Sequence, residues 1–199
     1  AAIRKRDGSR EKATKHLADG QRLMDAKDWD KAIAAIEAGQ ATEGTSDDDL
    51  SSKLQAAMDE AEAGRDALAH NRHSAQRKYD FGTQGIASEG YETAIKAFEE
   101  ALEFEVQDPA MTRKIEQGIE KAKGLIKERD AKIAKAQERY DAGQLSFLNK
   151  HYEDAIKEFE AGLAMEFDSA ELIDQLKAGK KKAHDMLEGA AAAEPEPQA

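Results

Sequence analysis

The chain of 199 residues contains no cysteine, which excludes disulfide bridges, thiolate metal sites and cysteine nucleophiles. It has only three prolines, and aromatic residues make up 6% of it. No apolar run approaches the roughly 18 residues that a membrane-spanning helix needs, so we expect a soluble protein with no membrane insertion. Because only 40% of the residues are hydrophobic, the core must be thin.

Acidic residues outnumber basic ones by 41 to 30, giving a formal net charge of −11. A negative surface repels nucleic acids and anionic lipids, so we expect protein partners and no nucleic acid. Alanine, glutamate and lysine dominate, and the few prolines leave long stretches uninterrupted, as is typical of long helices. The composition therefore predicts an all-α fold.

The same residues return three times along the chain, at offsets of 62 and then 61 positions. The matching positions are Gly20, Trp29, Ala32, Ile33 and Ile36; then Gly82, Tyr91, Ala94, Ile95 and Phe98; then Gly143, Tyr152, Ala155, Ile156 and Phe159. A fixed period of this kind indicates a protein built from stacked supersecondary units, each too small to bury its apolar face alone.

Each repeat reads as three helices. In the first repeat, apolar and small residues at helical spacing predict helices over 13–24 and 29–39, with a break at 26–28. A third helix is predicted from Leu50 onward, and Ser46–Asp49 supply the short polar residues that favour a helix N-terminus. The third helix of the second repeat is predicted to begin at Asp108-Pro109, and that of the third repeat at Asp168-Ser169.

The links between repeats are predicted to be helical as well. No proline interrupts residues 110–142, so one helix should join the second and third repeats, whereas Gly64 and the polar run 70–74 leave a kink open in the first link. We therefore predict an elongated array in which the third helix of one repeat runs into the first helix of the next. The predicted divisions are a basic N-terminal arm (1–9), three repeats (10–68, 69–129 and 130–189) and a disordered tail (190–199).

Residues 90–102 and 151–159 closely resemble the helical hairpin of tetratricopeptide repeats. The resemblance implies that two sets of small residues let the hairpin helices approach: Gly20, Gly82 and Gly143, and Ala32, Ala94 and Ala155. It also implies a packing role for Trp29, Tyr91 and Tyr152, whose replacement by alanine would cost about 3–5 kcal/mol if they are fully buried. Tandem tetratricopeptide repeats recur every 34 residues, so the added third helix, which resembles the capping helix of that family, departs from the pattern.

These features favour a non-enzymatic scaffold protein that mediates protein–protein contacts within a larger assembly, of a cytoskeletal or ciliary kind, in the cytoplasm. An adaptor or co-chaperone-like module that captures a peptide or helix stays open as an alternative. The residues that we expect to contact partners are Gln21, Thr83 and Gln144, one position after the repeated glycines, and Lys180, Lys181 and Lys182. None of the first three is asparagine, so a clamp for a terminal carboxylate is not expected.

Catalytic and metal-binding patterns are missing from the sequence. It has no phosphate-binding glycine loop, no G-x-S-x-G elbow and no H-E-x-x-H helix, so we expect no enzyme activity, small-molecule substrate or cofactor. His70 and His73 are three residues apart on a predicted helix, but two histidines do not make a site, so no metal is expected. Asp47–Asp49 lack the alternating ligands of a calcium loop and read as helix caps.

Overall fold

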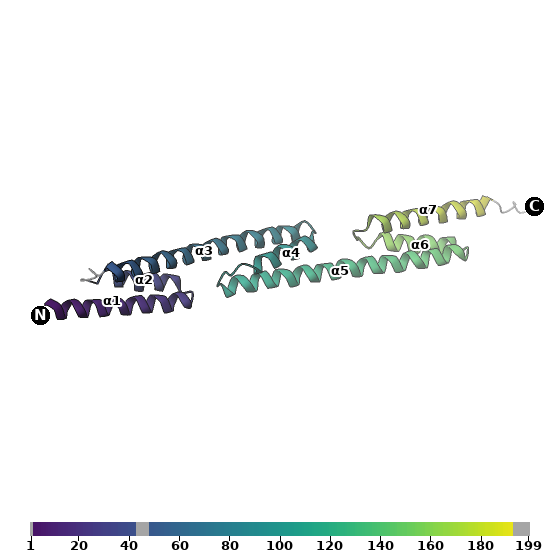
Figure 1. Cartoon of the computed structure of the whole chain (residues 1–199). Helices are drawn as coiled ribbons and strands as arrows, with labels where there is room; N and C mark the ends of the chain where they lie inside the picture. Colours follow the sequence, from purple (N-terminus) through teal and green to yellow (C-terminus); the bar gives the residue numbers. More distant parts are fainter. Residues whose placement is uncertain (1, 43–47, 193–199) are drawn as a thin grey trace, which may run out of the picture. The chain divides into compact units, whose positions relative to one another are not determined.

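The computed structural model describes residues 2–42 and 48–192, with side chains described over 7–42 and 48–189 (Figure 1). Within these ranges the chain forms seven α-helices and no β-strand, which confirms the all-α fold class. The helices are α1 (Ala2–Asp25), α2 (Trp29–Gln40), α3 (Asp48–Ala87), α4 (Tyr91–Leu102), α5 (Pro109–Leu148), α6 (Tyr152–Leu163) and α7 (Ala170–Ala192).

The helices that link the repeats are continuous. Helix α3 runs for 40 residues, so neither Gly64 nor the polar run 70–74, where the sequence left a kink open, interrupts it. Helix α5 also runs for 40 residues. Asp108 caps α5 as predicted, because its Oδ1 accepts hydrogen bonds from the N–H groups of Ala110 (2.9 Å) and Met111 (3.1 Å). Of the residues predicted to cap α3, Ser46 and Asp47 lie outside the described residues.

Each hairpin turn passes through one residue in the left-handed region. Lys27, Glu89 and Lys150, which are equivalent in the three repeats, have φ of 55°, 61° and 64°. After α1, the N–H of Asp28 donates to the carbonyl of Leu23 (2.9 Å) and that of Lys27 to the carbonyl of Met24 (2.8 Å). This pattern closes a helix end by satisfying its free carbonyl groups, and it produces the predicted break at 26–28.

The chain divides into two compact units. The first holds the chain up to Ser88 together with Lys96–Gly118, and the second holds Glu89–Ile95 together with the chain from Ile119 onward. The divisions fall in the turn after α3, inside α4 and inside α5. Residues 2–9 of the predicted arm are part of α1, and 190–192 of the predicted tail are part of α7, whereas 193–199 lie outside the described residues.

In the first compact unit, α1, α2 and α3 pack against one another around one apolar core. The apolar residues predicted at helical spacing form its centre. The buried members are Ala13, Leu17, Met24, Ala32, Ile33, Ile36, Leu50, Leu54, Ala57, Met58 and Ala61. In the second compact unit, α5, α6 and α7 surround the corresponding core, whose largest fully buried residues are Phe159 and Leu176.

The repeated glycines lie where the first two helices of each repeat approach most closely. A β-carbon built on Gly20 would lie 2.6 Å from Ile36 Cγ1. The equivalent distances are 2.7 Å from Gly82 to Phe98 and 2.6 Å from Gly143 to Phe159. Real β-carbons do not approach other atoms so closely, so glycine is required at this position of each repeat for steric reasons.

The aromatic residues that begin the second helix of each repeat are less buried than full core residues. Trp29, Tyr91 and Tyr152 are partly buried, whereas Ile36, Phe98 and Phe159 are at most 1% exposed. Trp29 packs at the edge of the first core, beside the turn. The cost of 3–5 kcal/mol predicted for full burial is therefore too high for these three residues, and the repeat is centred instead on the residue seven positions later.

No helix in the described part of the chain combines the length and the apolar character that crossing a membrane requires.

Candidate functional site

The three predicted contact residues that follow the repeated glycines lie on the first helices of their repeats. Gln21 and Thr83 are exposed and belong to the first compact unit, whereas Gln144 is half-buried and belongs to the second. Two of them bond within their own helix. The Thr83 hydroxyl donates to the Tyr79 carbonyl (3.0 Å), and Gln144 Nε2 donates to the Tyr140 hydroxyl (2.8 Å).

The three predicted lysines of α7 differ in their surroundings. Lys180 Nζ forms an ion pair with Glu160 Oε1 of α6 (2.8 Å), and this hydrogen bond lowers the pKa of the Glu160 carboxyl. Lys181 and Lys182 are exposed. Lys180 therefore joins α6 to α7, and only its two neighbours present their side chains mainly to solvent.

Sequence reasoning missed a contact that joins the first repeat to the second, within the first compact unit. Lys27, in the hairpin turn, forms an ion pair with Glu105 of the loop between α4 and α5, and the hydrogen bond lowers the pKa of Glu105. From α3, Arg72 Nε donates to the carbonyl of Val106 in the same loop (2.9 Å). Val106 is only 5% exposed. The loop of the second repeat thus covers the turn of the first.

Trp29 forms the apolar part of this junction. A β-carbon built on Gly64 of α3 would lie 2.5–2.6 Å from three carbons of the Trp29 indole. The ring therefore lies flat against the backbone of α3, where only glycine leaves room for it. Trp29 and Gly64 have a function that the repeat alignment does not show, because the residue equivalent to Gly64 in the next repeat is Leu125, 61 positions later.

The second compact unit contains the equivalent junction, between the second and third repeats. A cleft of about 370 Å³ separates the start of α4 and the middle of α5 from the loop between α6 and α7. Its lining residues are Glu89, Tyr91, Leu125, Glu128, Arg129, Lys132, Glu166, Phe167 and Asp168. Tyr91 and Leu125 occupy the positions of Trp29 and Gly64, so a smaller ring stands beside a larger aliphatic side chain.

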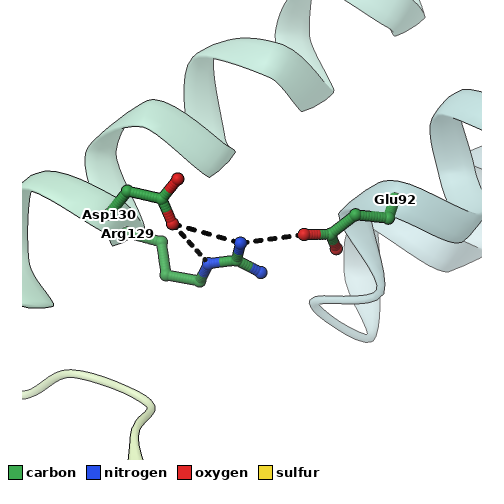
Figure 2. Close-up of polar contacts among 3 residues, drawn as sticks. All are labelled: Glu92, Arg129 and Asp130. Atoms are coloured by element: carbon green, nitrogen blue, oxygen red, sulfur yellow. Dashed lines mark hydrogen bonds and ion pairs between the residues drawn. The ribbon is translucent and has the colours of Figure 1, made fainter.

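An arginine of α5 fixes the start of α4 in this junction. As Figure 2 shows, Arg129 Nη2 lies between two carboxylates, 2.8 Å from Glu92 Oε1 and 3.1 Å from Asp130 Oδ1. The hydrogen bond from Arg129 lowers the pKa of Glu92, and the two carboxylates raise the pKa of Arg129. Glu92 lies in the first turn of α4, where the helix dipole also favours a negative charge.

One signal in the sequence pointed to these junctions. The loops between the second and third helices of repeats 2 and 3 contain the equivalent pairs Glu105-Val106 and Glu166-Phe167, in which an acidic residue is followed by an apolar one. An apolar side chain in such a loop needs a surface to cover it. Identifying that surface required the fold, because Lys27 and Glu105 are 78 residues apart.

The junctions combine ion pairs with apolar side chains, a composition suited to contacts between protein surfaces. Across the described residues, no three histidine, aspartate or glutamate side chains are placed to share a metal ion. The chain matches no model of a known protein family, and no curated protein has a detectably similar sequence.

Proposed function

We propose that this protein is a non-enzymatic scaffold of tetratricopeptide-like helical repeats, which spaces and binds protein components of a larger assembly of a cytoskeletal or ciliary kind. The observation that carries the proposal is the shared helix. Helix α3 supplies the third helix of the first repeat and the first helix of the second without a break. A flexible linker would let the two repeats move independently, whereas a continuous helix transmits position and orientation.

The dimensions of α3 support a spacer. At 1.5 Å per residue, its 40 residues extend over about 60 Å. A compact protein of 199 residues would have a radius of gyration of about 16 Å. Each repeat adds one hairpin to such a helix.

Small-angle X-ray scattering tests the spacing role directly. We expect a radius of gyration well above about 16 Å, the value for a compact chain of this length, and a pair-distance distribution with the long tail of a rod. A symmetric pair-distance distribution, together with the radius of gyration of about 16 Å expected for a compact chain, would refute the proposed spacing role. A variant with three consecutive glycines at 63–65 of α3 is the matched comparison, because it should broaden the distribution without changing chain length.

Partner binding distinguishes the scaffold from the alternative adaptor. An adaptor that captures a peptide on the first helices of its repeats should lose its partner when Gln21, Thr83 and Gln144 are all replaced by alanine. A scaffold that binds through other surfaces should keep it. Affinity capture with the full chain and this triple variant, compared by quantitative mass spectrometry, separates the two, with circular dichroism to show that the variant is folded.

A further inference from the structure

The first two repeats each present a corresponding face, and in each a loop of the following repeat lies beside it. In the first repeat, Lys27 and Trp29 lie under the loop that contains Glu105 and Val106. In the second, Tyr91 and Leu125 lie beside the loop that contains Glu166 and Phe167. The covering loop therefore brings an acidic residue followed by an apolar one to both faces.

The third repeat has the same face. Its turn residue is Lys150, which has the charge and the backbone conformation of Lys27 (φ of 64° and 55°). Tyr152 stands in place of Trp29, and Met186 of α7 is equivalent to Gly64 and Leu125, at the same 61-residue offset. In the described part of the chain no loop covers this face, and Lys150 is exposed while Met186 is 48% exposed.

Two exposed leucines come shortly before this turn in the chain. Leu145 and Leu148, in the last turn of α5, are 61% and 75% exposed. The equivalent positions in the earlier repeats are polar or small: Arg22 and Asp25 in the first, Gln84 and Ala87 in the second. The third repeat therefore gains apolar surface where the covered repeats have none. Exposed large apolar side chains that cluster on one surface mark contact sites.

We propose that this face, formed by Lys150, Tyr152 and Met186, is a docking site for another protein that presents a helix-to-helix loop with a glutamate followed directly by an apolar residue. In the docked state the glutamate pairs with Lys150, as Glu105 does with Lys27. The apolar side chain then packs between Tyr152 and Met186. The proposal deepens the scaffold function and rests on it for its biological role.

The loops that this chain itself carries make a second copy of the chain a poorer partner for this face. The loops that contain Glu105 and Glu166 are already engaged in their own junctions. The first repeat supplies Glu43, but the next residue is Gly44 where the other loops have Val106 and Phe167. A second copy thus offers the carboxylate without the apolar side chain.

The test uses the full chain with a fourth repeat attached as a probe. A second copy of residues 129–189 is fused after Gly189, which keeps the 61-residue register and presents a further Glu-Phe loop to the face, with the methionines of the added segment changed to leucine. Methionine oxidation by dilute peroxide is followed by mass spectrometry. Partly buried Met165 serves as the internal reference. We expect the oxidation rate of Met186 to fall about tenfold, as for a docked state that is about 90% populated.

The controls separate docking from a general effect of the added chain. Replacing the added loop's phenylalanine by serine should restore rapid oxidation of Met186. Lys150→Glu should weaken protection, and combining it with lysine in place of the added loop's glutamate should recover it. Unchanged oxidation in the extended chain, or protection that ignores both changes, would overturn the proposal.

A sedimentation series on the unextended chain tests the competing occupant. We expect a monomer at all concentrations. Self-association that Lys150→Glu abolishes would show that a second copy occupies the face, and would overturn the proposed partner. Either failure leaves the scattering test of the scaffold function independent, because scattering from the unextended chain does not depend on what binds the end face.

Discussion

The packing of Phe98 predicts a sharp difference between two glycines of the same helix. Both Gly118 and Gly124 lie in α5. A β-carbon built on Gly118 would lie 2.7 Å from Phe98 Cζ and 2.9 Å from Cε2, whereas one built on Gly124 meets no described atom within 4 Å. The Phe98 ring is 1% exposed and cannot turn away. Alanine should therefore be tolerated at position 124 but not at position 118.

The magnitudes follow from two opposing effects. Replacing glycine by alanine inside a helix stabilises it by about 1 kcal/mol, because alanine loses less backbone entropy on folding. Forcing a methyl group into a well-packed core costs about 1–3 kcal/mol. We expect Gly124→Ala to stabilise the protein by about 1 kcal/mol. Gly118→Ala should fall about 1–3 kcal/mol below it, the size of the packing cost.

The first repeat suggests a second change that should offset the cost of Gly118→Ala. There the buried residue is Ile36 instead of phenylalanine, and the position equivalent to Gly118 is Ala57. Phe98→Ile should therefore relieve Gly118→Ala, with a coupling of about 1 kcal/mol or more in the double-mutant cycle. The free energy of opening, measured by native-state amide hydrogen exchange in α4 and the first turns of α5, gives the local value. If Gly118→Ala stabilises as much as Gly124→Ala, the size-matching argument is wrong.

Three further predictions concern the turn, the junction and the ion pairs. Lys150→Gly should stabilise the third repeat by about 0.5–1 kcal/mol, because glycine adopts the left-handed conformation without steric cost. A lower urea midpoint would contradict this. Trp29→Ala should cost about 2 kcal/mol, less than a fully buried tryptophan, and should speed hydrogen exchange of the loop near Val106; an unchanged loop would argue against the junction. Lys78 lowers the pKa of Glu100 through a hydrogen bond, so the ionised carboxylate stabilises the fold above the ordinary glutamate value of 4.5. This effect is lost as the pH falls through the lowered pKa, so Glu100→Gln should reduce the loss of stability below pH 4.5 in urea titrations.

The order of the helices and the turns between them were predictable from the sequence, because the residues that determine them are local. Glycine at the close approach, alanine at the fully buried position and a capping aspartate before Pro109 each act within one helix or one turn. Their spacing can therefore be recognised in a single sequence. The continuity of α3 was harder to predict, since Gly64 is a helix breaker by propensity. The structure shows that Gly64 is there to make room for Trp29.

The junction surfaces could not be predicted in the same way, because they depend on pairs that are distant in the chain. Arg72 bonds the carbonyl of Val106, 34 residues away, and a backbone acceptor leaves no trace in the sequence. The charge at the turn also changes from Lys27 to Glu89 and back to Lys150. From the alignment alone this variation looks like that of a solvated surface position.

The two kinds of contact have different consequences for how the repeats are assembled. Inside a repeat, size matching dominates: Phe98 and Phe159 each face glycines on two helices, while Ile36 faces one glycine and Ala57. Between the first and second repeats, Lys27 pairs with Glu105 of a loop that also carries Val106. At the next junction Arg129 pairs with Glu92, beside the loop that carries Phe167. Size matching is satisfied within each repeat and needs no neighbour. The junction face is covered only when a neighbouring repeat packs on it. The face at Lys150 is therefore the surface on which binding of another protein would be most favourable in free energy.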